Sequence, residues 1–339
     1  MKSLEKFSSP NKIKWLYPLG ILFLLAAAAG SLMLGSSSLS IGEMLDALCN
    51  GFQYSAGTRI FGYVRLPRTL ASLACGAALS VSGAVIQGVL RNRLASPSII
   101  GVNAGAGLAV TLCAALGILG GWQTSLFSFV GAFAAVMLVS LGAKRWGASR
   151  GTVILIGVAM NSFLGAISTA VTTFLPEVGV MSNDFKVGAF SAVTYPRLLP
   201  AVMLIAITIA ALRTLHNQLD VLTLGEETAQ GLGMDPGKMR TVFLLFAALL
   251  AGCAVSLAGL LSFVGLLIPH AIRRIAGSKA SHLTGLSALF GAGFVCLCDT
   301  IARTVFAPYE VPVGIIMAFL GAPFFVFILI AQRGGHKND

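Results

Sequence analysis

Charged residues are scarce in this chain of 339 residues: Asp, Glu, Lys and Arg make up 10% of it, and hydrophobic residues 56%. With a mean hydropathy of +0.88, the sequence is not that of a soluble globular domain. The longest non-membrane stretches, 35–67, 176–198 and 213–239, are shorter than the roughly 50 residues of a small domain. There is also no Gly-x-x-x-x-Gly-Lys-Ser/Thr motif to cradle phosphates. If nucleotide drives this protein, the nucleotide-binding domain is on another chain.

The six cysteines and four histidines indicate neither a metal site nor a cofactor site. No Cys-x-x-Cys and no His-x-x-x-His occurs, and Cys296 and Cys298 point to different faces of a helix. Most of the cysteines fall in apolar stretches, where they pack as small residues. Since carboxylates are not clustered with them either, an integral membrane enzyme is disfavoured.

Long apolar stretches dominate the chain instead. A helix needs about 20 apolar residues to span a bilayer, and long polar/apolar alternation typical of a membrane β-barrel is absent. Ten candidate spans lie near 15–34, 68–88, 98–118, 123–143, 152–175, 199–212, 240–258, 260–275, 283–303 and 312–331. We therefore predict an all-α polytopic membrane protein of about ten transmembrane helices, forming a single transmembrane domain over residues 1–339.

The net charge of +11 reflects topology rather than nucleic-acid binding. With ten spans and a cytoplasmic N-terminus, most of the 23 lysines and arginines fall on the inside, so both termini are predicted to be cytoplasmic. The outer segments keep Arg59, Arg65, Arg68, Lys186, Arg197 and Arg303. A signal peptide is the alternative for the first apolar stretch, because Lys12 and Lys14 precede it and Ala27-Ala28-Ala29 follow, but its removal would place the wrong terminus inside.

Two features of the predicted spans concern helix packing and the membrane surface. Small residues recur every fourth position in Gly76/Ser80/Ala84/Gly88 and in Gly101/Gly105, a spacing that lets helices approach closely in lipid. Residues 40–52 predict a short amphipathic helix outside the membrane, with Ile41, Met44, Leu45 and Leu48 on its apolar face.

The inner segment 213–239 mixes acidic and apolar residues. It contains Asp220, Glu226, Glu227 and Asp235, four of the chain's 12 acids, together with Leu222, Leu224, Leu232 and Met234. Glycines at 225, 231 and 233 and Pro236 divide it into short helices. An exposed patch of this kind favours contact with a cytoplasmic partner over a plain solvated loop.

Polar side chains inside the spans are few. The fifth span carries Asn161, Ser162, Ser168, Thr169, Thr172 and Thr173, with 168/172 and 169/173 at i,i+4 spacing. These hydroxyls either bond carbonyls of their own helix or form one wall of a hydrophilic pathway, and the sequence leaves both open. Asp299 and Arg303, also at i,i+4, are expected to pair near the outer end of the ninth span.

Two arginines in Arg65-Leu66-Pro67-Arg68 are expected at a membrane boundary, because an arginine at the centre of a spanning helix costs roughly 2.5–3.5 kcal/mol. This block continues through Gly76–Gln87 and Arg91–Pro97 to Gly101–Ala106. Further blocks are Leu224-Gly225 to Leu232-Gly233, Gly259–His270, Asp299-x-x-x-Arg303, and Glu310–Gly314 with Gly321–Phe325. Together, in this order, they resemble the permease subunits of ABC importers for iron–siderophores, haem and vitamin B12.

The resemblance extends over nearly the whole chain, with one departure. The family usually has Asn-Pro-Leu-Ala-x-Pro at the turn between the second and third spans, but Arg93 replaces the first proline here. Pro97 still supplies the break, and Arg93 adds positive charge to the inner side, so the predicted topology is unaffected.

The resemblance implies a set of partners and roles. Such permeases have ten spans, work in pairs of identical or related chains, bind two ATPase subunits inside and receive a substrate-binding protein outside. Leu224, Gly225, Glu226, Glu227, Gly231, Leu232 and Gly233 would form the coupling element for the ATPase, and Arg65, Arg68 and Arg303 would meet acidic residues of the binding protein. ATP-driven movement would rock the pair between outward- and inward-open states, and Ser168, Thr169, Thr172 and Thr173 are the candidate pathway lining.

By the family's commonest cargo, a ferric siderophore is expected; haem and cobalamin stay open. The main rival is an ion-coupled secondary transporter, which needs an ion site near the middle of the membrane. The acids in or beside a span, Asp299 and Glu310, are predicted near the outer surface, which counts against proton coupling.

Overall fold

The computed structural model describes residues 10–35, 39–53, 55–118, 120–145 and 150–334, and all regular elements within them are helical. The long helices are α1 (Pro10–Met33), α4 (Leu66–Val89), α5 (Val102–Ala115), α6 (Gly121–Arg145), α7 (Arg150–Phe174), α10 (Tyr195–Thr214), α13 (Pro236–Ala258), α14 (Val264–Ala276), α15 (Ala280–Thr304) and α16 (Val313–Gly334). The short ones are α2 (Ile41–Asn50), α3 (Ala56–Ile60), η2 (Phe61–Arg65), η3 (Pro97–Ile100), α8 (Pro176–Met181), α9 (Asn183–Val187), α11 (His216–Leu224) and α12 (Glu226–Gly231).

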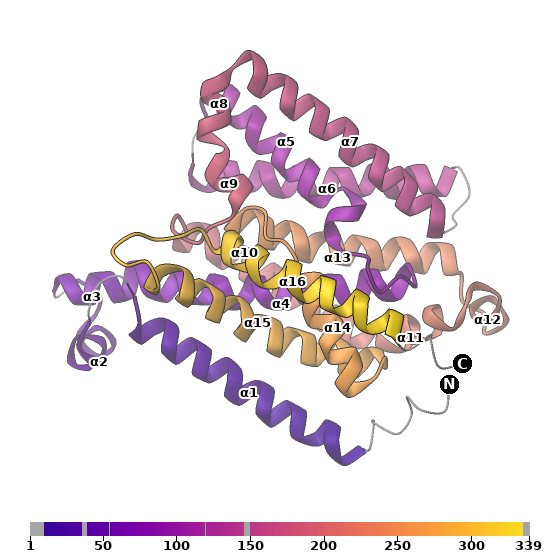
Figure 1. The fold of residues 1–339 in the computed structure, drawn as a ribbon, viewed down its shortest axis with the longest axis horizontal. Coiled ribbons are helices and arrows are strands. Elements are labelled where there is room, and N and C mark those ends of the chain that lie inside the picture. The colour runs from indigo at the N-terminus through magenta and orange to yellow at the C-terminus, as the bar shows by residue number, and fades with distance from the viewer. Residues whose placement is uncertain (1–9, 36–38, 54, 119, 146–149, 335–339) are drawn as a thin grey trace.

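Each of the ten predicted spans coincides with one long helix, which confirms the predicted fold class. Within the described residues, seven helices are long and apolar enough to cross a membrane, and two shorter apolar helices begin at Val102 and Val313. Figure 1 shows α2 and α3 at one end of the bundle, here called the outer end, and α11 and α12 at the other, the inner end. Helix α1 begins and α16 ends at the inner end. The terminal residues 1–9 and 335–339, predicted to be cytoplasmic, lie outside the described residues.

The eighth predicted span is helical over only part of its length. Helix α14 has 13 residues, which at about 1.5 Å per residue gives roughly 20 Å, less than the ~30 Å hydrocarbon core. The non-helical segment 259–263 precedes it, and there Leu260 donates its N–H to the Phe185 carbonyl at 2.9 Å. Ala189 N–H in turn donates to Ala258 O at 2.8 Å. Non-helical backbone at this depth is tolerated because such internal partners satisfy it.

Helix α4 forms the centre of the subunit and contacts α13, α14 and α15. Glycines allow these contacts to be backbone to backbone. A Cβ added to Gly83 would lie 1.8 Å from the Gly265 oxygen, and one on Gly76 would lie 2.2 Å from the Gly291 oxygen. Gly76 and Gly105, which meets Gly131, thus confirm the predicted small-residue packing, but Gly88 faces only side chains.

Helix α7 lies at the periphery of the bundle, beside α5 and α6 (Figure 1). Only 11% of the residues in its 18-residue apolar stretch are buried, compared with 78% in the corresponding stretch of the segment that contains α4. The predicted amphipathic helix is also present as α2, capped by Ser40, with Ile41, Leu45 and Leu48 exposed.

Candidate functional site

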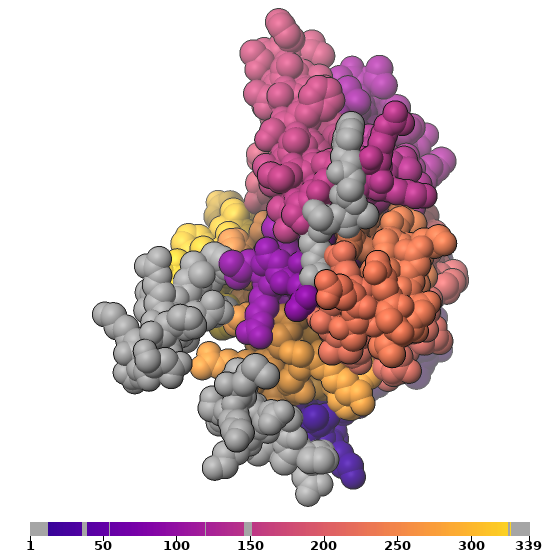
Figure 2. Space-filling model, turned by 90° about the vertical axis from the view of Figure 1, so that its right-hand side faces the viewer, coloured from indigo at the N-terminus to yellow at the C-terminus, as the bar shows by residue number. Residues whose placement is uncertain are grey.

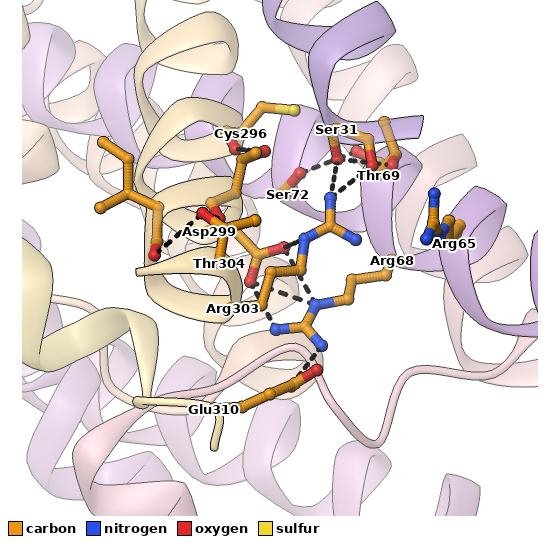
Figure 3. A network of polar contacts seen from close by, with 12 residues as sticks. Ser31, Arg65, Arg68, Thr69, Ser72, Cys296, Asp299, Arg303, Thr304 and Glu310 are labelled. Carbon is orange, nitrogen blue, oxygen red and sulfur yellow. Dashed lines mark hydrogen bonds and ion pairs between the residues drawn. The ribbon is translucent and has the colours of Figure 1, made fainter. Parts of the chain in front are cut away.

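The outer end contains a cluster of three arginines and two carboxylates (Figure 3). Because α3, η2 and α4 follow one another without interruption and Pro67 is accommodated in the first turn of α4, Arg65 and Arg68 lie one turn apart. Asp299 and Arg303 come from the last turns of α15, and Glu310 comes from the segment that leads to α16. The cluster therefore joins segments that are more than 200 residues apart.

Arg68 is the central cation of this cluster. Its Nε and Nη2 donate to the two carboxylate oxygens of Asp299 at 3.0–3.2 Å, and its Nη1 donates to Glu310 Oε2 at 2.7 Å. Asp299 is fully buried. The predicted i,i+4 pair of Asp299 and Arg303 is present but longer, with Nε to Oδ2 at 3.8 Å. The principal partner of Asp299 is therefore Arg68, which sequence spacing did not reveal.

Arg65 and Arg303 cap the outer, C-terminal end of α1. Arg65 Nη1 donates to the carbonyls of Leu32 and Met33 at 2.7 and 2.8 Å. Arg303 Nη2 donates to the carbonyl of Ser31 at 2.5 Å and to its Oγ at 2.6 Å. The last carbonyls of a helix have no partner within the helix and carry partial negative charge, so cations are stabilised there.

The three arginines predicted to face the binding protein are thus inside the subunit. The exposed fractions of Arg65, Arg68 and Arg303 are 2%, 6% and 3%. In this arrangement their guanidinium groups bond α1, Asp299 and Glu310, and Glu310 is the exposed member of the cluster. Their docking role stays a prediction, and a direct contact would require the cluster to open.

At the inner end, the segment 213–239 folds into α11 and α12 as predicted, with Gly225 at φ 139° between them. Leu219, Leu222 and Ala229 are buried, which anchors the segment to the bundle. Leu224 and Leu232 are 62% and 64% exposed. We call residues 224–233 the coupling segment. Glu227, Gly231 and Gly233 are also exposed on it, and Gly225 is half-buried.

Three of the four acids in this inner region have structural partners. Glu226 pairs with the buried Arg240 at 2.5 Å, and Asp220 Oδ1 accepts the Ala280 N–H at 2.7 Å. Asp235 caps α13: the Lys238 backbone N–H, the Lys238 side chain and the Gly237 N–H lower the pKa of its carboxyl. Because this pKa is depressed, the cap persists at neutral pH and is lost as the pH falls through it. The fourth acid, Glu227, is exposed.

The polar residues of α7 do not form one continuous stripe. Ser168 bonds Thr111 of α5 at 3.0 Å, and Thr172 and Thr173 donate to carbonyls of their own helix. Asn161 donates to Ser98 O at 2.8 Å across the gap to η3. A surface hollow of about 440 Å³ lies here, and Ser98, Asn103, Asn161 and Ser162 are its polar lining. The sequence had indicated Asn161 and Ser162 as polar but not Asn103.

Comparison with known proteins agrees with this arrangement. Residues 21–331 match the model of the FecCD transport family. The chain belongs to this family. It is 35% identical over 306 residues to the Fe(3+)-citrate import system permease protein YfmD of Bacillus subtilis, covering 90% of both chains. It is 33% identical over 320 residues to the hemin transport system permease protein HmuU of Yersinia pestis, covering 92% of this chain and 94% of the relative.

A solved structure has the same fold. It is an inward-facing ABC transporter assigned to the metal-chelate type, and it superposes with a TM-score of 0.81 at 28% identity, covering 95% of this chain and 100% of the other. The FecCD-family chain is therefore a multi-pass membrane permease subunit of a bacterial ABC importer and is not itself catalytic. An importer of this class works with ATPase subunits and a binding protein.

Proposed function

We propose that this permease carries a ferric siderophore across the cytoplasmic membrane. The observation that supports this most directly is its membership of a family whose similar members include permeases for Fe(3+)-citrate and for hemin. The lining of the hollow beside α7 is mainly apolar, and amide and hydroxyl groups supply its hydrogen-bonding sites. These groups suit the oxygen-rich surface of a ferric chelate, and no His, Met or Tyr, the usual haem ligands, is among its described lining residues.

Uptake of labelled ligands tests the cargo. A strain that lacks this chain, with and without the chain restored, is given a ferric hydroxamate, a ferric catecholate, ferric citrate, haem and cobalamin. We expect uptake of a ferric siderophore to fall at least tenfold and to return on restoration. Loss of haem or cobalamin uptake alone would identify that ligand as the cargo. If no ligand is affected, either a redundant permease carries the cargo or the cargo lies outside this panel.

We propose that the coupling segment, within a single permease domain over residues 1–339, transmits ATP-driven movement from two ATPase subunits. Leu224, at the end of α11, and Leu232, just after α12, are exposed. The buried Leu219 and Leu222 fix α11 to the bundle. If the two exposed leucines sit in a groove of the ATPase subunit, movement of that subunit would carry α11 and α12 along as one body. The movement would then reach α4 and α15, which α11 contacts.

We propose that the exposed face of α7 lines the translocation pathway, with a second permease subunit, identical or related, on the other side. Replacing Asn161 and Ser162, which line the hollow, with leucine and alanine is expected to reduce uptake at least tenfold, because the hollow loses hydrogen-bonding groups. The matched comparison is Thr169, Thr172 and Thr173 replaced by valine, nearer the outer end. Unchanged uptake in both variants, with normal membrane levels, would exclude α7 as the pathway wall.

We also propose that Arg65, Arg68 and Arg303 serve docking of the binding protein by holding the outer surface in shape, with Glu310 as its exposed member. Charged groups on such a transient interface set register and speed encounter more than they add affinity. The substrate would pass between the paired permease subunits without chemical change.

A further inference from the structure

A second cavity lies at the inner end, apart from the hollow beside α7. Its volume is about 280 Å³, and it is enclosed by the inner end of α4, the turn that follows it, α11, α14 and the start of α15. The side chains that line it include Arg91, Arg93, Arg273, Thr223 and Ser278. Figure 2 views the molecule from this end. The turn after α4, in purple, lies near the centre, beside the orange surface of α11 and α12. The volume is just below the roughly 300 Å³ of the smallest drug-sized pockets, so a small ligand fits better than a large cofactor.

The turn that presents the arginines has a defined shape. Arg91 has φ 48°, a left-handed conformation that non-glycine residues adopt at some cost. The Asn92 side-chain oxygen accepts the Leu94 N–H at 2.9 Å, and the Ala95 N–H donates to the Asn92 carbonyl at 3.1 Å. Leu90 and Ala95 are buried on either side. The family's proline is therefore not needed for a fixed turn, and Arg93 at that position contributes a guanidinium group to the cavity.

Among the described residues, no acidic side chain that lines this cavity neutralises the positive charge of its arginines. Among the described residues, neither Arg91 nor Arg93 forms an ion pair, and Arg273 donates to the neutral amide oxygen of Gln87 at 2.8 Å. No carboxylate is among the described lining residues. Asp220 of α11 does not line the cavity, and its Oδ1 accepts the Ala280 N–H at the start of α15. Arg274 and Lys279 add further positive charge nearby.

We propose that this cavity binds a phosphate-bearing anion, either free phosphate or the headgroup of an anionic lipid. One guanidinium group can bind two phosphate oxygens at once, and three arginines line this cavity. Ser278 also lines it, just before the positive N-terminal end of α15. The Arg91 Nη1 atom would lie 3.7 Å from a Cβ on Gly225, so the site adjoins the residue that joins α11 to α12 in the coupling segment. Binding at the site does not depend on the identity of the cargo.

The test uses the full-length permease purified in complex with its ATPase subunits. Inorganic phosphate is titrated calorimetrically against a chloride control, and retention of phosphatidylglycerol is compared with that of phosphatidylcholine by native mass spectrometry. Three forms are measured: the unaltered protein, Arg91→Gln with Arg93→Gln, and Arg274→Gln, which removes one charge from an exposed neighbour outside the cavity. We expect the double variant to bind at least tenfold more weakly and the Arg274 variant to bind as the unaltered protein does.

The two probes distinguish the sources of the phosphate group. Retention of phosphatidylglycerol without phosphate binding identifies a lipid headgroup, and phosphate binding identifies a soluble anion. Binding of neither probe above its control, or equal weakening in the Arg274 variant, overturns the proposal. It is also overturned if the double variant loses its ATPase subunits while anion binding stays unchanged, because the arginines then serve that interface. Since Arg91 and Arg93 are exposed, the thermal midpoint of the double variant is expected to stay unchanged.

Discussion

Replacing Arg68 with glutamine is expected to destabilise the protein by about 3–5 kcal/mol, because Asp299 is then left buried without its main counter-charge. Asp299 is fully buried and accepts three of the four Arg68 hydrogen bonds, from Nε and Nη2. Arg303 Nε, at 3.8 Å, is too distant to replace them. The measurement is the thermal unfolding midpoint of the detergent-solubilised permease, detected as the loss of monodisperse protein on heating.

Two further variants show whether the buried pair is responsible. Lys238 and Asp235 form an ion pair whose side chains are 83% and 51% exposed, and Lys238→Gln is expected to leave the unfolding midpoint nearly unchanged. Arg68→Gln combined with Asp299→Asn is expected to recover part of the loss, because no uncompensated charge stays buried. If the double variant is no more stable than Arg68→Gln alone, the ion pair is not the cause.

The same variants distinguish a structural role of Arg68 from direct contact with the binding protein. If Arg68 contacts the binding protein directly, association stays weak and loses salt sensitivity even in the double variant. If association recovers together with stability, the arginine acts by holding the outer surface in shape.

Replacing Leu224 and Leu232 together with glutamate is expected to weaken association with the ATPase subunits by about a hundredfold or more and to abolish uptake. Burial of one leucine contributes roughly 1.5–3 kcal/mol, and about 1.4 kcal/mol corresponds to a tenfold change in affinity. Introduced carboxylates would also be costly to bury in an interface. Co-purification of the ATPase subunits and uptake of the cargo are measured on the same membranes.

A matched control is available at the outer end. Leu116 follows α5 and is 77% exposed, so Leu116→Glu adds the same charge where no ATPase subunit binds. We expect both readouts to be unchanged for it. Retention of ATPase subunits by the Leu224/Leu232 variant, with normal uptake, would show that the coupling segment does not transmit the movement.

The helices and the short helices of the inner segment followed from the sequence because they depend on local properties. The orientation stays a prediction from properties of the same kind. Span length, the distribution of lysine and arginine, and the glycines and proline around 225–236 act over a few residues or along one segment. The blocks at 65–106 and 224–233 likewise carried the family resemblance before any contact was known. Even the shortened helix α14 overlaps a predicted span, although the non-helical residues before it were not predicted.

Partners and exposure were decided only by the tertiary structure. Arg68 pairs with Asp299, 231 residues away, and Arg65 with carbonyls of α1, contacts that exist only once α1, α4 and α15 have packed. Leu222 and Leu224 look alike in sequence, yet one is buried and the other is exposed, because α11 packs on α4 through one face. From the sequence, Arg93 is only one more positive charge on the inner side. The tertiary structure places it at the same cavity as Arg91 and Arg273. Electrostatic energy depends on distance and burial in three dimensions, and neither is encoded by spacing along the chain.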